Sequence, residues 1–272
     1  MTPHRIGDIE ILVLSDGTLD IPTERALCST NLIEQRFSEA GRSLPPRLPV
    51  NCFVIRSGGR VALVDTGAAD TMGPTLGLLG AALEGAGVAP EAVDVVMLTH
   101  IHPDHSNGLR DEAGAVFGNA ELVMHAAELA FWCDAERRSD NAERRVRQEV
   151  AHHQVAPYRD RLRLFDGEAE VFPGVTAVPM PGHTPGHSGY LIASGGDNLL
   201  IWGDITHIPE LQVPNPEVAM VFDVDPAQAV ETRRAVFERV VSDGLNVAGM
   251  HVPGRGFLRL ERAGGGWRHV LV

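Results

Sequence analysis

The sequence predicts an α/β protein of four layers, an αββα sandwich in which helices cover the outer faces of two central β-sheets. Hairpin-forming apolar runs come first, strands then alternate with helices, and the same cycle recurs in the second half of the chain. Each half can form a sheet with helices on one side, so the two halves bury their remaining sheet faces against each other. No Pro/Gly/Ser-rich linker divides the chain, and we therefore expect a single domain over residues 1–272.

In the first half, hydrophobic patterning predicts five strands. They span residues 9–14, 51–56, 60–65, 93–98 and 121–124. A turn at Ser15-Asp16-Gly17 is expected to end the first of them, and Ser57-Gly58-Gly59 joins the second and third as a hairpin. Residues 27–49 are expected to be irregular, and residues 75–86, followed by Gly87, to be helical.

The second half begins with a helical insertion at about residues 126–158, whose charged surface is typical of a solvated helix pair or a lid. A second helix is expected over residues 226–242, because Pro226 suits its first turn and Gly244 lies just after its end. Seven further strands are predicted. They span residues 163–165, 175–178, 189–193, 198–202, 246–250, 256–261 and 267–271.

Composition narrows the classes of partner and compartment. Lys and Arg number 23 against 36 Asp and Glu, and the net charge of −13 argues against nucleic-acid binding. Three cysteines without a CxxC pair predict neither a disulfide scaffold nor a cysteine-type zinc site. We see no apolar leader and no run long enough to span a membrane, so we expect a cytoplasmic protein without membrane contact.

The most informative segment is Thr99-His100-Ile101-His102-Pro103-Asp104-His105, directly after the apolar run 93–98. Imidazole and carboxylate groups are ligands of zinc and similar divalent ions. The alternate spacing of His100 and His102, followed by Asp104 and His105 in the loop, allows one short segment to supply ligands to two ions. Further ligand types follow other apolar strands in the same way. They are His183, Asp204 and His251.

Together these seven residues resemble the complete ligand pattern of the metallo-β-lactamase superfamily of hydrolases, and Val64-Asp65-Thr66-Gly67 is similar to its strand-end aspartate motif. The resemblance runs in order from residue 51 to residue 251. A finer likeness is to the branch that holds methyl parathion hydrolase and related lactonases and arylesterases. It is carried by Ile6-Gly7-Asp8 with Ser15-Asp16-Gly17-Thr18-Leu19, by Trp202-Gly203-Asp204-Ile205-Thr206-His207, by Phe222-Asp223-Val224-Asp225 and by His251-Val252-Pro253-Gly254.

The resemblance implies a metallo-β-lactamase fold and a site for two divalent metal ions. Zinc suits the ligands best, although manganese, cobalt and iron also bind such groups. By the resemblance, one ion is held by His100, His102 and His183, the other by Asp104, His105 and His251, and Asp204 bridges them. Asp65 is expected to accept a hydrogen bond from a ligand histidine and so to orient its ring.

The implied chemistry is hydrolysis by a hydroxide that the two ions share. We expect Asp104 to shuttle a proton to the leaving group, Asp204 to bridge, and His207 to donate a hydrogen bond next to it. The preferred substrates are small, apolar, uncharged lactones or aryl esters, with organophosphate triesters as the alternative.

The pocket residues are harder to predict. Phe131 and Trp132, adjacent aromatics in the helical insertion, suggest a pocket wall near the leaving group. The segment 27–49 is expected either to cover the site or to join two subunits of a homodimer, with Leu32 and Phe37 as apolar contributors.

Other members of the same fold offer competing functions. A flavodiiron oxidoreductase is disfavoured because His102 stands where that pattern has glutamate. An iron persulfide dioxygenase shares the ligand types, and a single bound iron would indicate it. A glyoxalase II-like thioesterase usually carries a basic helical tail, whereas the tail from residue 254 to residue 272 looks β-like.

Overall fold

The computed structural model describes residues 2–134, 136 and 138–272 and contains two seven-stranded sheets. The first sheet has the order β1-β2-β3-β4-β5-β8-β9. Its strands are β1 (His4–Ile6), β2 (Ile9–Asp20), β3 (Arg47–Ser57), β4 (Arg60–Val64), β5 (Val95–Met97), β8 (Glu121–His125) and β9 (Leu162–Phe165). A short hairpin of β6 (Arg110–Asp111) and β7 (Gly114–Ala115) stands apart from it.

The second sheet has the order β10-β11-β12-β13-β14-β15-β16. Its strands are β10 (Ala169–Phe172), β11 (Val175–Pro179), β12 (Ser188–Ser194), β13 (Asp197–Ile201), β14 (Asn246–Ala248), β15 (Phe257–Ala263) and β16 (Gly266–Leu271). The α-helices are α1 (Thr30–Glu39), α2 (Leu79–Gly85), α3 (Pro103–Ser106), α4 (Ala126–Cys133), α5 (Ala142–Val155), α6 (Pro209–Gln212) and α7 (Pro226–Ser242). Short 3₁₀ turns are η1 (Thr23–Arg25), η2 (Pro90–Ala92), η3 (Asn107–Leu109), η5 (Ala156–Arg161) and η6 (Gly203–Ile205).

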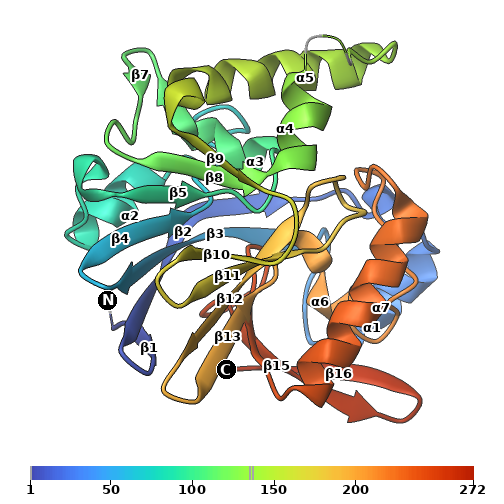
Figure 1. The fold of residues 1–272 in the computed structure, drawn as a ribbon. Helices are drawn as coiled ribbons and strands as arrows, with labels where there is room; N and C mark the ends of the chain where they lie inside the picture. The colour runs from blue at the N-terminus through green and yellow to red at the C-terminus, as the bar shows by residue number, and fades with distance from the viewer. Residues whose placement is uncertain (1, 135, 137) are drawn as a thin grey trace.

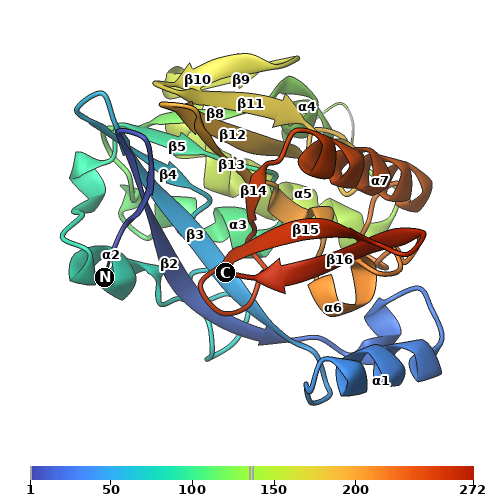
Figure 2. The ribbon, with the colours of Figure 1, turned by 90° about the horizontal axis from the view of Figure 1, so that it is seen from below.

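The predicted four-layer sandwich is confirmed, because the strands bury both of their faces. Along β3, Phe53 and Ile55 point between the sheets, whereas Cys52 and Val54 point toward the helices α2, α4 and α5. On the far side of the second sheet, Phe237 of α7 belongs to a separate core. Figures 1 and 2 show α4 and α5 on one side of the paired sheets and α7 on the other.

Three predictions about local structure are wrong. Ser15-Asp16-Gly17 does not end the first strand but forms a β-bulge, because β2 continues to Asp20 with a register shift against β3. Residues 27–49 contain helix α1, whose N-terminus is capped by the Ser29 side chain. In residues 75–86 only Leu79–Gly85 is helical.

The helical insertion at 126–158 is present as α4, α5 and the start of η5, with residues 135 and 137 outside the described part. Within the described residues, no helix is both long and apolar enough to cross a bilayer.

The topology gathers the predicted ligand loops at one edge. Strand β4 is parallel to β5, and β13 is parallel to β14, so the loops after each pair open in the same direction. Asp65 directly follows β4, the histidine-rich loop follows β5, Asp204 follows β13 and His251 follows β14. Catalytic loops in such α/β sheets lie where these carboxyl ends meet.

Candidate metal centre

Three predicted ligand nitrogens form a compact triangle. Nε2 of His100 lies 3.1 Å from Nδ1 of His102, which lies 2.9 Å from Nε2 of His183, and the third side is 3.2 Å. Nitrogens bound tetrahedrally to zinc at about 2.0–2.1 Å lie roughly 3.3 Å apart, so the triangle suits one shared cation. Burial, and then the neighbouring histidines, lower the pKa of His100 and His102 well below the ordinary value. Both rings are therefore neutral, the form that binds metal.

A second group of ligand atoms lies beside the first. Oδ2 of Asp104 lies 3.5 Å from Nε2 of His105 and 3.6 Å from Nε2 of His251. Burial lowers the pKa of His105, but the carboxylates of Asp204, Asp104 and Asp65 outweigh burial and hold that pKa well above its ordinary value. The same carboxylates favour a divalent cation at this point.

Asp204 stands between the two groups. Its Oδ2 lies 3.7 Å from Nε2 of His100 and 3.4 Å from Nε2 of His183, and 3.4 Å and 3.3 Å from Nε2 of His105 and His251. Within the described part of the chain, Oδ1 of Asp204 and Nε2 of His105 are buried without a hydrogen-bond partner. Buried polar atoms without partners are costly, and bound cations would satisfy them, so the residues present fit a two-metal site.

The remote ring nitrogens are held by acceptors, which turns the free nitrogens toward the centre. Nδ1 of His105 donates to Oδ2 of Asp65 at 2.7 Å, and Nδ1 of His251 donates to the Pro49 carbonyl at 2.8 Å. Nδ1 of His183 lies 2.7 Å from Oδ1 of Asp223. Acceptors of this kind fix the tautomer and orientation of ligand histidines.

Asp65 organises more than His105. Its two oxygens also accept hydrogen bonds from the backbone N–H and hydroxyl of Thr99, both at 2.8 Å. The same hydroxyl oxygen lies 3.0 Å from Nδ1 of His100 and can accept a hydrogen bond from it. Asp65 therefore contacts His105 directly and reaches His100 through Thr99, and it does so from a left-handed backbone conformation with φ of 58°.

Two supporting acids were missed by sequence reasoning. Glu128 is fully buried on α4 and accepts from Ile101 N (2.8 Å), Trp132 Nε1 (2.7 Å), Thr184 Oγ1 (2.7 Å) and Gly186 N (3.0 Å). It thereby ties the His100–His102 loop to the loop that carries His183. The sequence feature that could have indicated its burial is a single acidic residue within the otherwise apolar run AAELAFWC.

Asp223, the second missed acid, also accepts the Met220 N–H at 2.8 Å. It lay inside one of the motifs that suggested the branch, but no role was predicted for it. Burial raises the pKa of Asp223, but its bond to His183 outweighs this and lowers the pKa to about 2.

Two further histidines adjoin Asp204. His187 donates from Nδ1 to the Met180 carbonyl at 2.9 Å and accepts from the Asp204 N–H at 2.9 Å, so it fixes the backbone of Asp204. Nε2 of His207 lies 3.0 Å from Oδ2 of Asp204. Burial lowers the pKa of His187 to about 3 and that of His207 to about 4, so both are neutral at pH 7.

Comparison with known proteins identifies the family. A profile described as "Metallo-beta-lactamase superfamily" matches residues 45–251. The chain belongs to the metallo-β-lactamase superfamily.

Relatives and solved structures agree with this membership. The "Uncharacterized protein YobT" of Bacillus subtilis (strain 168) is 28% identical over 59% of this chain and 63% of that protein. An "N-acyl homoserine lactonase" of Bacillus sp is 27% identical over 53% of this chain and 58% of that protein. The matches thus span less than two thirds of either relative.

Two solved structures match nearly the whole chain. The hydrolase AbOPH of the β-lactamase superfamily has a TM-score of 0.94 and 28% identity, and the match covers 99% of this chain and 96% of that one. AidC, described as a dizinc quorum-quenching lactonase, has a TM-score of 0.91 over 100% of this chain and 97% of its own. At 20% identity, the second likeness concerns the fold alone.

In the present chain, a cavity of about 310 Å³ opens beside the ligand cluster. It is lined by His102, Asp104, Asp204, His207 and His251, by the charged residues Asp20, Arg25 and Arg147, and by Leu19, Ile21, Pro22, Met72, Pro103 and Phe222. Phe222 contacts the site directly, because its ring centroid lies 4.7 Å from that of His207.

None of the residues predicted for the pocket lines this cavity. Phe37 is 1% exposed in a core beneath α1 and α6, and Leu32 packs against the same core, so neither is among the residues that line the cavity. Phe131 packs against the core under α4. Trp132 is buried, and its ring centroid lies 5.4 Å from that of His102. The two residues line a neighbouring hollow, so Trp132 is connected to the site through that ligand.

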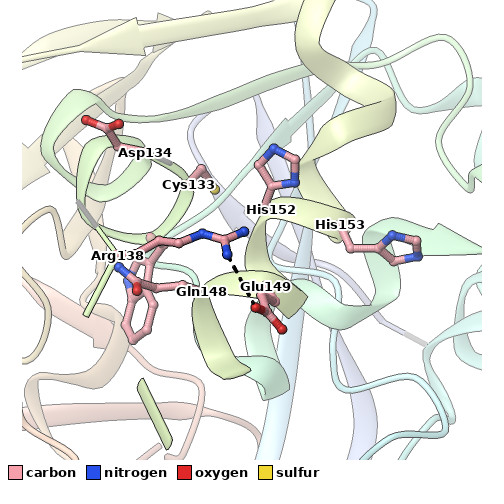
Figure 3. Close-up of a pocket in the computed structure, with 8 residues that line it drawn as sticks. Cys133, Asp134, Arg138, Gln148, Glu149, His152 and His153 are labelled. Carbon is pink, nitrogen blue, oxygen red and sulfur yellow. Dashed lines mark ion pairs between the residues drawn. The ribbon is translucent and has the colours of Figure 1, made fainter. Parts of the chain in front are cut away.

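A separate hollow of about 260 Å³ lies between α4 and α5, where Arg138 and Glu149 form an ion pair beside Cys133 and His152 (Figure 3). Burial, and then the charge of Glu128, raise the pKa of the Cys133 thiol to about 12. The thiol is therefore protonated and a poor nucleophile at neutral pH.

Proposed function

We propose that this chain is a metal-dependent hydrolase with two metal ions, and that it acts on lactones or aryl esters. The observation that carries the proposal is the position of Asp204, whose Oδ2 lies within 3.7 Å of ligand nitrogens from both histidine groups. A carboxylate in this position suits a bridging ligand between two cations.

In this proposal the ligands divide as the resemblance implies. His100, His102 and His183 hold one ion, Asp104, His105 and His251 hold the other, and Asp204 contacts both. Zinc suits this donor set, and manganese, cobalt or iron can replace it. When bound, the two ions would lower the pKa of a shared water toward neutrality, so that it attacks as hydroxide, and would polarise the oxygen that gains charge.

The remaining steps belong to the protein. Asp104 reaches the cavity with its carboxylate, takes up the proton of the attacking water and gives it to the alkoxide or phenoxide oxygen as the ester C–O bond breaks. The oxygen of the water remains in the carboxylate product. His207 steadies Asp204 from the cavity wall, and Ile21 and Phe222 receive the hydrocarbon part of the substrate and exclude water.

The named relatives support this choice among the hydrolases of the superfamily. The matched Bacillus sp relative is an N-acyl homoserine lactonase, and AidC is a lactonase with two zinc ions. An acyl lactone presents an ester bond next to a hydrocarbon chain, which fits a metal cluster beside apolar walls.

The proposal is tested by metal analysis of the purified protein combined with a hydrolysis panel. The panel contains acyl-homoserine lactones, dihydrocoumarin, aryl esters and a phosphotriester. We expect two metal ions per chain and hydrolysis of at least one lactone or aryl ester. Absence of hydrolysis by the metal-loaded protein would contradict the proposal, preference for the phosphotriester would reassign the substrate, and a single iron would indicate persulfide chemistry.

A further inference from the structure

The cavity beside the ligand cluster contains two arginines from distant parts of the chain. Arg25 comes from η1 and Arg147 from α5, and both line the cavity that Asp204 and His207 also line. Neither belongs to the candidate metal ligands, and the metal chemistry gives them no role. They therefore indicate something about the molecule that enters the cavity.

The cavity carries carboxylates as well as these arginines, namely Asp20 and the candidate ligands Asp104 and Asp204. Asp20 is neutralised by Arg47, whose guanidinium donates to both carboxylate oxygens at 2.7 and 2.9 Å. Arg147 pairs with Glu143 at 2.6 Å on the exposed side of α5. Within the described part of the chain, Arg25 forms no ion pair.

The backbone of Arg25 is fixed to the same frame as the ligands. Its carbonyl accepts the Val221 N–H at 2.9 Å, and Ala26 forms a β-bridge with Met220. The chain then continues into Phe222, which lines the cavity, and Asp223, which orients His183. The backbone of Arg25 is thus fixed relative to the reacting centre, and its exposed side chain lines the cavity.

Arginine in this setting recognises a particular chemistry. A guanidinium binds a carboxylate through two parallel N–H donors, and the energy is larger where apolar neighbours exclude water. Leu19, Ile21 and Met72 are apolar residues that line the same cavity as Arg25 and Arg147. The net charge of −13 repels anions at long range, so attraction of an anion must arise locally in the cavity.

We propose that the substrate is an ester or lactone that carries a carboxylate at the end remote from the scissile bond, and that Arg25 and Arg147 bind this carboxylate. This inference rests on the proposed hydrolase function and specifies its substrate class. It replaces the uncharged substrate that the sequence favoured. The hydrocarbon between the two ends lies against Ile21 and Phe222, and the ester group lies at the ligand cluster.

The test uses two aryl esters that differ in one charge, 4-nitrophenyl hydrogen glutarate and its neutral methyl ester. The metal-loaded wild-type protein is expected to have the higher kcat/KM for the charged ester, and added salt is expected to reduce the difference. Arg25→Gln and Arg147→Gln are each expected to raise KM for the charged ester about 10- to 100-fold, the range for loss of one charge-assisted hydrogen bond, and to raise KM for the neutral ester much less. Arg259→Gln is the control, because this exposed arginine of β15 changes the net charge equally and does not line the cavity.

Binding supplies a second measurement, independent of turnover. The 4-nitroanilide of glutaric acid, a slowly cleaved amide analogue, is titrated calorimetrically into the metal-loaded protein. We expect binding that weakens in both arginine variants and not in Arg259→Gln.

Equal use of the two esters, or equal loss on both in the arginine variants, would overturn the carboxylate proposal while leaving the hydrolase function intact. If neither ester, and no lactone, is hydrolysed, the hydrolase function itself is contradicted and the substrate proposal falls with it.

Discussion

Oδ2 of Asp65 lies 2.7 Å from Nδ1 of His105, although the two residues are 40 positions apart in the sequence. The same carboxylate receives the Thr99 hydroxyl, which contacts Nδ1 of His100. One buried acid behind the centre therefore sets the orientation of a histidine in each ligand group.

We expect Asp65→Asn to weaken binding of both metal ions about 10- to 100-fold, as loss of such an outer partner typically does. Three donors meet the two carboxylate oxygens, and an amide would turn its NH₂ group toward one of them. Asparagine tolerates the left-handed backbone at this position, so added strain is not the cause. Competition with a chelating dye measures the two affinities, and Asp197→Asn, an exposed change on β13, is the control. Unchanged affinities would refute the orienting role.

Asp223→Asn is expected to act on one ion only. Asp223 contacts His183, which belongs to the three-histidine group, and makes no contact with His105 or His251 within the described structure. Titration of the metal-free protein with cobalt should therefore show one weakened and one nearly normal binding step in the visible spectrum. Equal weakening of both steps would contradict the proposed division of the ligands.

Glu128→Gln should lower stability as well as metal binding. The carboxylate accepts three hydrogen bonds from two ligand loops and one from Trp132 of its own helix, and glutamine offers one acceptor oxygen in place of two. Leaving buried donors unpaired costs about 1–3 kcal/mol. Thermal unfolding of the metal-free protein should show a lower Tm than both the wild type and Glu231→Gln, an exposed control on α7. An unaltered Tm would show that the four bonds contribute little.

The sequence predictions were accurate where neighbouring residues in the chain determine the structure, and less accurate where tertiary contacts determine it. Helix α7 was predicted with its observed ends, because Pro226 and Gly244 mark them within the chain. The bulge at Ser15 and Gly17 was mistaken for a turn, because Gly17 adopts its positive φ inside a strand that passes close to the Thr75 carbonyl. Only the tertiary contact distinguishes these two cases.

The same contrast between local pattern and tertiary contact explains why the candidate metal ligands were predicted and two of the acids that support them were not. Each predicted ligand follows an apolar strand, and the parallel pairs β4·β5 and β13·β14 bring most of these strand ends together. Glu128 acts through residues 27 to 58 positions away, so neither periodicity nor spacing reveals its partners. Phe37 was placed in the pocket because the fold of residues 27–49 was missed, and helix α1 instead buries it.

Asp204→Ala gives the strictest test of the two-metal centre. Oδ2 of Asp204 is the atom that both histidine groups approach, so its removal should weaken both ions and abolish hydrolysis together. Elemental analysis after gel filtration should show fewer than two ions per chain, and activity on the best panel substrate should be lost with them. Asp160→Ala, an exposed change in η5, should keep both properties. Full activity of Asp204→Ala with two ions retained would refute the bridging role, because no other carboxylate among the described residues approaches nitrogens of both groups.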